Sequence, residues 1–255
     1  MGIITTDEKH YRSIANTIRR YNTNVNYLMT PSKIAELAPT LYTTGQSKGY
    51  NSGYSSGYSS GYIEGRDIMI SRKLTEISDT SLTNVGNYAF AGMPIKSMNL
   101  PKVNTVGKYG FRGCIYLTEI DLPNLQRLSG KGEYAFGYCQ EVTRYNLPRL
   151  ATDSTSSTYA ELRQTFEGNY SLERIELKNE IVIGTKCFYN CKVLKALILG
   201  DSASLNSTDA FDKTPIQSGT GYIYVPDNKV NAYKKATNWS LFASQIKGYS
   251  ELPAG

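Results

Sequence analysis

Six phenylalanines recur along the middle of this 255-residue chain, and their spacing constrains the fold more than any other feature. The intervals between them are 21, 25, 30, 22 and 23 residues. A repeat of roughly 20 to 50 residues indicates a solenoid, in which each copy contributes one coil to a shared core. The phenylalanines are Phe90, Phe111, Phe136, Phe166, Phe188 and Phe211.

A short motif, apolar-x-x-apolar-x-leucine, follows each of the first five phenylalanines, and its leucine comes 10 or 11 residues later. The alternation predicts a short strand with every second residue facing inward. Such strands bury their apolar faces only when they stack in parallel, with the phenylalanine filling the far side of each coil. The motifs are Ile95-Met98-Leu100, Leu117-Ile120-Leu122, Val142-Tyr145-Leu147, Leu172-Ile175-Leu177 and Leu194-Leu197-Leu199.

The repeat around Phe111, VGKYGFRGCIYLTEIDLP, resembles the BspA-type leucine-rich repeats of bacterial surface and bacteriophage proteins. The likeness covers residues 74–216 and is loosest around Phe136 and Phe166, where insertions lengthen the interval. We therefore expect an α/β repeat: a leucine-rich-repeat solenoid with short parallel strands over residues 67–220, a small N-terminal helical module and a C-terminal β/α cap.

Residues 1–44 predict two short helices. Residues 5–21 form an amphipathic pattern with a capping box at Thr5 and Glu8, and Tyr11, Ile14 and Ile18 make one apolar stripe. Helices of this size do not make a stable core alone, so the stripe requires a partner. The segment also resembles a small module of phage tail-associated proteins, which implies anchoring to other virion proteins.

Residues 45–66 repeat glycine every 4 residues, with a tyrosine after most of the glycines. Three interpretations remain open: a packed stalk between copies of the chain, a flexible linker, or a segment docked on the solenoid. A packed stalk implies a homo-oligomer. Fibre-like virion parts of this family type are often threefold, so the resemblance implies a trimer. The candidate stalk residues are Gly49, Tyr50, Gly53, Tyr54, Gly57, Tyr58, Gly61 and Tyr62.

Residues 221–255 predict a cap over the last coil, which would otherwise expose its core. A strand at Tyr222–Val225 should be followed by a helix capped by Asp227 and by an apolar cluster of Trp239, Phe242 and Ile246. This ending resembles the ending of phage-encoded repeat proteins of the same type, through Thr214-Pro215-Ile216 and residues 219–226.

The composition argues against catalysis, cofactors and metals. The one histidine, His10, lies far from the repeats, and no phosphate-binding loop, zinc motif or calcium loop occurs. Four cysteines fall at or near inward positions, where we expect them to pack as small apolar residues; Cys187 and Cys191 as a metal pair is the weaker alternative.

Charge and hydrophobicity exclude two further classes of partner. The net charge of +6 comes mostly from the two ends of the chain, so the repeats offer no basic stripe for nucleic acid. No apolar run reaches the length of a membrane span. The start of the chain lacks the pattern of a secretory signal, so we expect synthesis in a host cytoplasm.

What remains is a binding surface on the outward side of the strands. We expect two rows of outward residues, which Ala196 and Ile198 continue. These rows could recognise a cell-wall glycan or a surface protein of the host. The alternative is a solvated ladder in which opposite charges on neighbouring coils pair. Glu119 and Arg144 should pair across neighbouring coils. The candidate residues are Ser97, Asn99, Glu119, Asp121, Arg144, Asn146, Arg174 and Glu176.

These expectations, together with the resemblance, favour a phage virion protein of the tail, baseplate or fibre that recognises a host surface. The alternatives are a capsid decoration or head fibre, a bacterial adhesin of the BspA type, and a structural spacer without a ligand.

Overall fold

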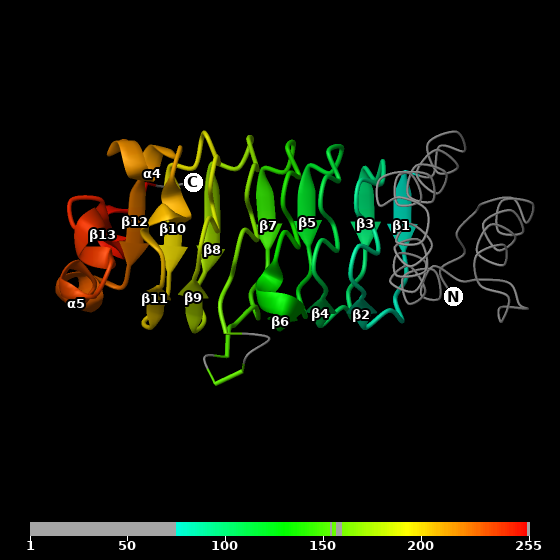
Figure 1. Cartoon of the computed structure of the whole chain (residues 1–255), viewed down its shortest axis with the longest axis horizontal. Coiled ribbons are helices and arrows are strands. Elements are labelled where there is room, and N and C mark those ends of the chain that lie inside the picture. The colour runs from blue at the N-terminus through cyan, green and yellow to red at the C-terminus, as the bar shows by residue number, and fades with distance from the viewer. Residues whose placement is uncertain (1–74, 154, 157–159, 254–255) are drawn as a thin grey trace, which may run out of the picture.

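The computed structural model describes residues 75–153, 155–156 and 160–253 (Figure 1). The helical module predicted for residues 1–44, with Tyr11, Ile14 and Ile18, lies outside the described residues. The glycine–tyrosine segment of residues 45–66 lies outside them as well.

One row of short strands runs the length of the described chain, one strand per coil (Figure 1). The chain returns to the same side of the structure after each repeat, and every pairing in this row is parallel. The strands are β1 (Glu76–Ser78), β3 (Ser97–Asn99), β5 (Glu119–Asp121), β7 (Arg144–Asn146), β8 (Arg174–Leu177), β10 (Ala196–Leu199), β12 (Tyr222–Val225) and β13 (Ile246–Gly248).

A second row of shorter parallel strands lies along another edge of the coils, below the first in Figure 1. Two short helices, α4 (Pro215–Ser218) and α5 (Val230–Lys235), belong to the C-terminal end. The chain is therefore an α/β repeat rich in strands. The second row consists of β2 (Asn84–Val85), β4 (Thr105–Val106), β6 (Arg127–Leu128), β9 (Ile181–Ile183) and β11 (Ala203–Leu205).

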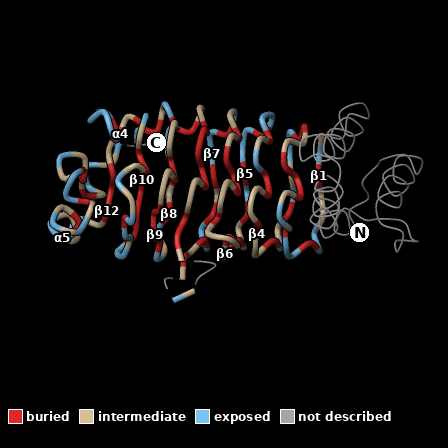
Figure 2. The backbone as a smooth tube through the Cα atoms, viewed as in Figure 1, coloured by how far each residue is buried: buried red, intermediate tan, exposed pale blue. Residues whose placement is uncertain are grey.

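The six repeat phenylalanines form one continuous column inside the coils, as their spacing predicts. Neighbouring ring centroids lie 5.2, 5.9, 5.8, 5.3 and 5.9 Å apart, and each pair is stacked. The inward residues of the strands complete this core, so buried residues recur in coil after coil (Figure 2). Burial of such large rings, together with the inward leucines and isoleucines, stabilises each coil.

A row of hydrogen bonds, which the sequence analysis missed, links the coils beside this column. In four coils, the residue three positions after the phenylalanine donates to a backbone carbonyl of the preceding coil. The Cys114 thiol donates to Phe90 and the Cys139 thiol to Phe111, each at 3.1 Å. Burial raises the pKa of the Cys139 thiol to about 12, which keeps the donating proton in place. These cysteines are thus buried, as predicted, but they also act as donors.

Asn169 occupies the same position in its coil and makes more bonds than any cysteine. Its fully buried amide nitrogen donates to the carbonyl oxygens of Phe136 at 3.0 Å and Phe166 at 2.7 Å. Its amide oxygen accepts from the hydroxyl of Tyr145 at 2.8 Å. An amide can satisfy three buried groups at once, which a thiol cannot do.

Two expectations for the C-terminal residues are wrong. Asp227 does not cap the helix; its carboxylate accepts from the backbone N–H and the hydroxyl of Ser250 at 3.1 and 2.6 Å. Ile198, expected to face outward into solvent, is buried. The residues after β13 fold back toward β10, and the Tyr249 hydroxyl donates to the carbonyl of Leu199.

Candidate functional site

The eight candidate residues lie on four consecutive strands of the first row, β3, β5, β7 and β8. None of them is buried, because they occupy the outward positions that alternate with core residues such as Ile120 and Ile175. The structure therefore brings them together on one surface, which we call the strand face.

Neighbouring coils are paired across the strand face in register. The Arg144 Nη1 atom lies 2.9 Å from the Glu119 Oε1 atom, which is the ion pair expected from the sequence. The Asn146 side-chain amide donates to the Asp121 carboxylate at 2.7 Å. Asn99 makes a longer bond of 3.4 Å to the hydroxyl of Ser78. These contacts are polar and open to water, so each contributes little to stability.

In the described part of the chain, the first row of strands is interrupted twice, between β3 and β5 and between β7 and β8. The second interruption carries a cavity. β7 pairs with β5, and β8 pairs with β10, but no ladder joins β7 to β8 in the described part of the chain. A cavity of about 630 Å³ opens on the strand face at this point, and we call it the strand-face hollow. Its polar lining comes from Thr143, Arg144, Asn146, Arg174, Glu176 and Lys178.

Two features of the sequence coincide with the interruption between β7 and β8 and are absent from the one between β3 and β5. The interval between Phe136 and Phe166 is the longest of the repeats, at 30 residues. Tyr145 also takes the inward strand position at which β5 and β8 carry isoleucine, and its ring lies edge-on to Phe136 and Phe166 at 5.6 and 5.1 Å. A tyrosine is longer than an isoleucine and needs a partner for its hydroxyl when buried, so β7 is held by Asn169 as well as by its neighbouring strand.

Charged groups converge on one carboxylate at the rim of the strand-face hollow. The two oxygens of Glu176 each receive a cation at 2.8 Å, Arg174 Nη2 on one and Lys178 Nζ on the other. The hydrogen bonds from Arg174 and then Lys178 lower the pKa of Glu176, so it is ionised at neutral pH. With Arg144, the lining holds three cations and one carboxylate, and Glu119, the partner of Arg144, lies on β5 outside the lining.

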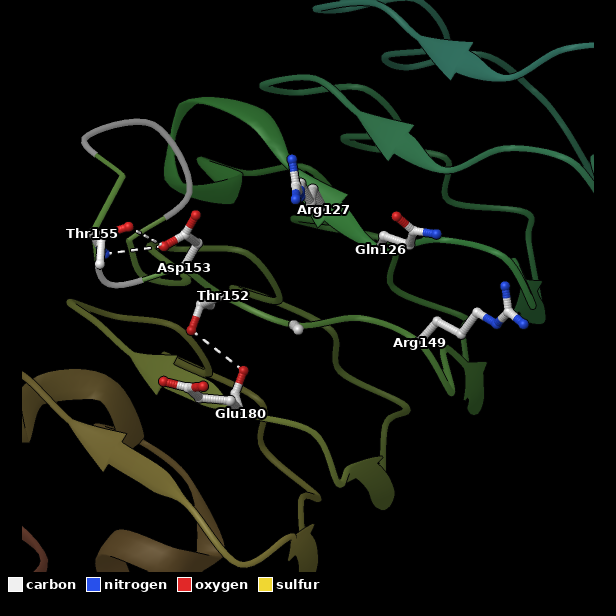
Figure 3. Close-up of a pocket in the computed structure, with 8 residues that line it drawn as sticks. Gln126, Arg127, Arg149, Thr152, Asp153, Thr155 and Glu180 are labelled. Carbon is white, nitrogen blue, oxygen red and sulfur yellow. Dashed lines mark hydrogen bonds between the residues drawn. The ribbon is translucent and has the colours of Figure 1, made fainter.

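A second cavity, of about 510 Å³, lies beside the insertion that follows β7 (Figure 3). Figure 3 shows Asp153 and Thr155 at one end and Arg149 at the other. Asp153 accepts from the backbone N–H and hydroxyl of Thr155 at 3.1 and 2.7 Å. We name it the insertion hollow, and its lining is mostly polar.

Tyrosines form a further ladder along the turns beside the phenylalanine column. Tyr88 stacks on Tyr109 at 4.5 Å and Tyr109 on Tyr134 at 5.1 Å, and the Arg112 guanidinium lies 5.1 Å from the centre of the Tyr138 ring. The sequence analysis did not predict this stacking. The rings stack on one another and are half-buried, so the ladder mainly covers the core.

No cluster of three histidine, cysteine or carboxylate side chains suited to a metal ion occurs among the residues that the structure describes. Within the same residues, none of the helices is both long and apolar enough to cross a membrane.

The sequence matches the family model described as the BspA type leucine rich repeat region, which has 6 copies, over residues 69–164 and 162–240. Parallel strands repeated coil by coil in the described part of this range define the class as a leucine-rich-repeat protein. The chain belongs to the BspA-type leucine-rich-repeat family. This membership indicates a surface-binding or adhesin-like repeat protein. No curated protein matches the chain.

Proposed function

We propose that this chain is a structural protein of a bacteriophage virion, in the tail, baseplate or fibre, and that its strand face recognises a host surface. The likeness of Thr214-Pro215-Ile216 and residues 219–226 to the ending of phage-encoded repeat proteins supports the virion assignment. A glycan of the host cell wall or a host surface protein is the proposed partner.

The observation that carries the recognition function is the composition of the strand face around its hollow. Outward residues of β5, β7 and β8 are charged or amide side chains, and those of β7 and β8 line a cavity of about 630 Å³. Recognition sites combine a concave shape with a few polar groups that fix the orientation of a ligand. The exposed pairs of this surface, such as Arg144 with Glu119, are weak enough to be exchanged for pairs with a ligand.

The rest of the chain is proposed to hold this surface in place. Residues 67–220 form one leucine-rich-repeat solenoid, and residues 221–255 cap its last coil. Residues 1–44 attach the chain to other virion proteins, and residues 45–66 pack copies together as a trimer. In this proposal the chain acts without catalysis and without a cofactor.

To test the recognition function, we would measure how labelled full-length chain binds to cell envelopes isolated from the bacterial culture that produces this chain. We expect saturable binding that falls at least about tenfold when Arg144 and Asn146 are both replaced by alanine, while an Arg149→Ala control binds like the wild type. Binding that is absent, or that responds equally to both variants, would contradict recognition by the strand face.

The virion assignment is tested by mass spectrometry of particles purified from a lysed source culture. We expect peptides of this chain in the particle band, and their confinement to the bacterial surface fraction would favour the adhesin instead. Light scattering of the full chain should give about three times its 28.3 kDa mass. A mass of one chain would contradict the trimer.

A further inference from the structure

We propose that the strand-face hollow binds the acid group of an anionic glycan, a carboxylate or a phosphate carried on a sugar. Arg144, Arg174 and Lys178 would hold the acid group. This inference rests on the recognition function proposed above and names the chemistry of its ligand.

The balance of charge at the rim favours an anion. The cations Arg144, Arg174 and Lys178 line the hollow, and the carboxylates that pair with them belong to Glu119 and Glu176. Within the lining, three cations stand against one carboxylate, Glu176, whereas Glu119 and Asp121 lie on β5 outside it. An incoming acid group therefore completes the pairing without displacing either carboxylate entirely.

Breaking the existing ion pairs costs little free energy. The side chains of Arg144 and Lys178 are 68% and 56% exposed, so their ion pairs are screened by water. A guanidinium presents several N–H donors in one plane and recognises a carboxylate or a phosphate with two hydrogen bonds. Arg144 and Arg174 stand on opposite sides of the gap between β7 and β8, so an acid group seated in the gap is within reach of both strands.

The remaining lining suits the sugar that carries the acid. Asn146 and Thr143 offer amide and hydroxyl groups at the rim, and Tyr145, Leu147 and Ile175 form a buried apolar floor. A sugar ring has polar edges and a partly apolar face, so it matches such a mixed lining. The cavity of about 630 Å³ lies within the roughly 300–1,000 Å³ that is usual for small-ligand sites.

The proposal predicts the direction in which a substitution of Glu176 changes the affinity for an acid group. Its carboxylate holds Arg174 and Lys178 and, in doing so, competes with a bound acid for the same two cations. Glu176→Gln keeps the shape of the side chain but releases both cations, so acid binding should become tighter. A merely structural role for Glu176 would make binding weaker or leave it unchanged.

The test is isothermal titration calorimetry of the full chain at about 50 mM salt with two matched pairs of probes. One pair is galacturonic acid trimer and its fully methyl-esterified form; the other is mannose 6-phosphate and mannose. We expect at least one acid form to bind at least about tenfold more tightly than its neutral partner. The pair that shows the preference identifies the acid as carboxylate or phosphate.

The variants locate the site. Arg174→Gln should weaken acid binding at least about tenfold, Glu176→Gln should tighten it about threefold or more, and Arg149→Gln, at the insertion hollow, should change it less than twofold. If Arg174→Gln does not fold, as judged by its melting curve, Arg144→Gln takes its place with the same expectation.

Several results would overturn the proposal: neither acid is preferred, Glu176→Gln weakens binding, or Arg149→Gln weakens it as much as Arg174→Gln. If the chain still binds cell envelopes through the strand face while both acids fail, only the anionic-glycan inference falls. If envelope binding fails as well, the proposed recognition function falls with it.

Discussion

Asn169→Ala tests whether the buried hydrogen bonds beside the phenylalanine column hold the coils together. The substitution removes two donated bonds, at 3.0 and 2.7 Å, and the acceptor of the Tyr145 hydroxyl at 2.8 Å. A buried neutral hydrogen bond contributes about 1 kcal/mol net, so the three together predict a loss of about 3 kcal/mol in the free energy of unfolding. For a folded part of this size, that loss lowers the melting temperature by about 6 to 12 °C.

The assay is urea unfolding of the full chain, followed by circular dichroism and checked against intrinsic fluorescence. Asn169→Cys should lose less, about 1 to 2 kcal/mol, because a thiol at this position can still donate to the preceding coil as Cys139 does. Tyr145→Phe should lose about 1 kcal/mol, and its effect should not add fully to that of Asn169→Ala because the two share a bond.

Asn146→Ala is the matched control, because Asn146 makes one bond, to Asp121, on the open strand face. It should change the free energy of unfolding by less than about 0.5 kcal/mol. The reasoning is refuted if Asn169→Ala loses less than about 1 kcal/mol, or if Asn146→Ala loses as much as Asn169→Ala.

Four further predictions concern the core, the cysteines and the carboxylate of Glu161. Phe188→Ala, in the middle of the column, should lose about 4 kcal/mol in urea unfolding, whereas Tyr116→Ala, at a side chain 52% exposed, should lose less than about 0.5 kcal/mol. A thiol reagent at pH 8 should label none of the 4 cysteines in the native chain and all of them in urea, since every one is buried. Burial also raises the pKa of Cys139 to about 12, so the urea midpoint should fall as the pH rises above about 9 toward 12, and a flat profile would contradict this. Burial alone would raise the pKa of Glu161, but hydrogen bonds from Asn206, Lys131 and Arg163 prevail and lower it. The contribution of Glu161 to the free energy of unfolding should therefore be present above about pH 4.3 and be lost as the pH falls further. Glu161→Gln should lower the free energy of unfolding by about 2 kcal/mol at pH 7 and should weaken its dependence on pH in the acid range. An unchanged dependence on pH in the acid range would refute this role.

The candidate surface shows how far local pattern reaches. Outward positions such as Glu119, Asp121 and Arg144 could be assigned from the sequence, because period-two alternation places every second residue of a strand on one side. The same rule placed Ile198 outward, but residues after β13 fold back toward β10. Alternation gives the direction of a side chain; it does not show what another part of the chain lays over it.

The sequence by itself determined the coil. The phenylalanine spacing and the leucine motifs predicted one stacked ring and one short parallel strand per repeat, and the structure has both, because each is set by contacts between equivalent positions of neighbouring repeats. The family match over residues 69–164 and 162–240 covers the same part of the chain.

Only the tertiary structure decided where the repetition fails and what forms there. The gap between β7 and β8, the hollow lined by Arg144 and Arg174, and the bonds of Asn169 arise where one long repeat meets its neighbour. A repeat pattern describes what the coils share and does not describe a junction where one coil differs. The packing of Tyr145 against the rings of Phe136 and Phe166 depends on their positions in three dimensions. The position of this surface could therefore be predicted from the sequence, but its shape could not.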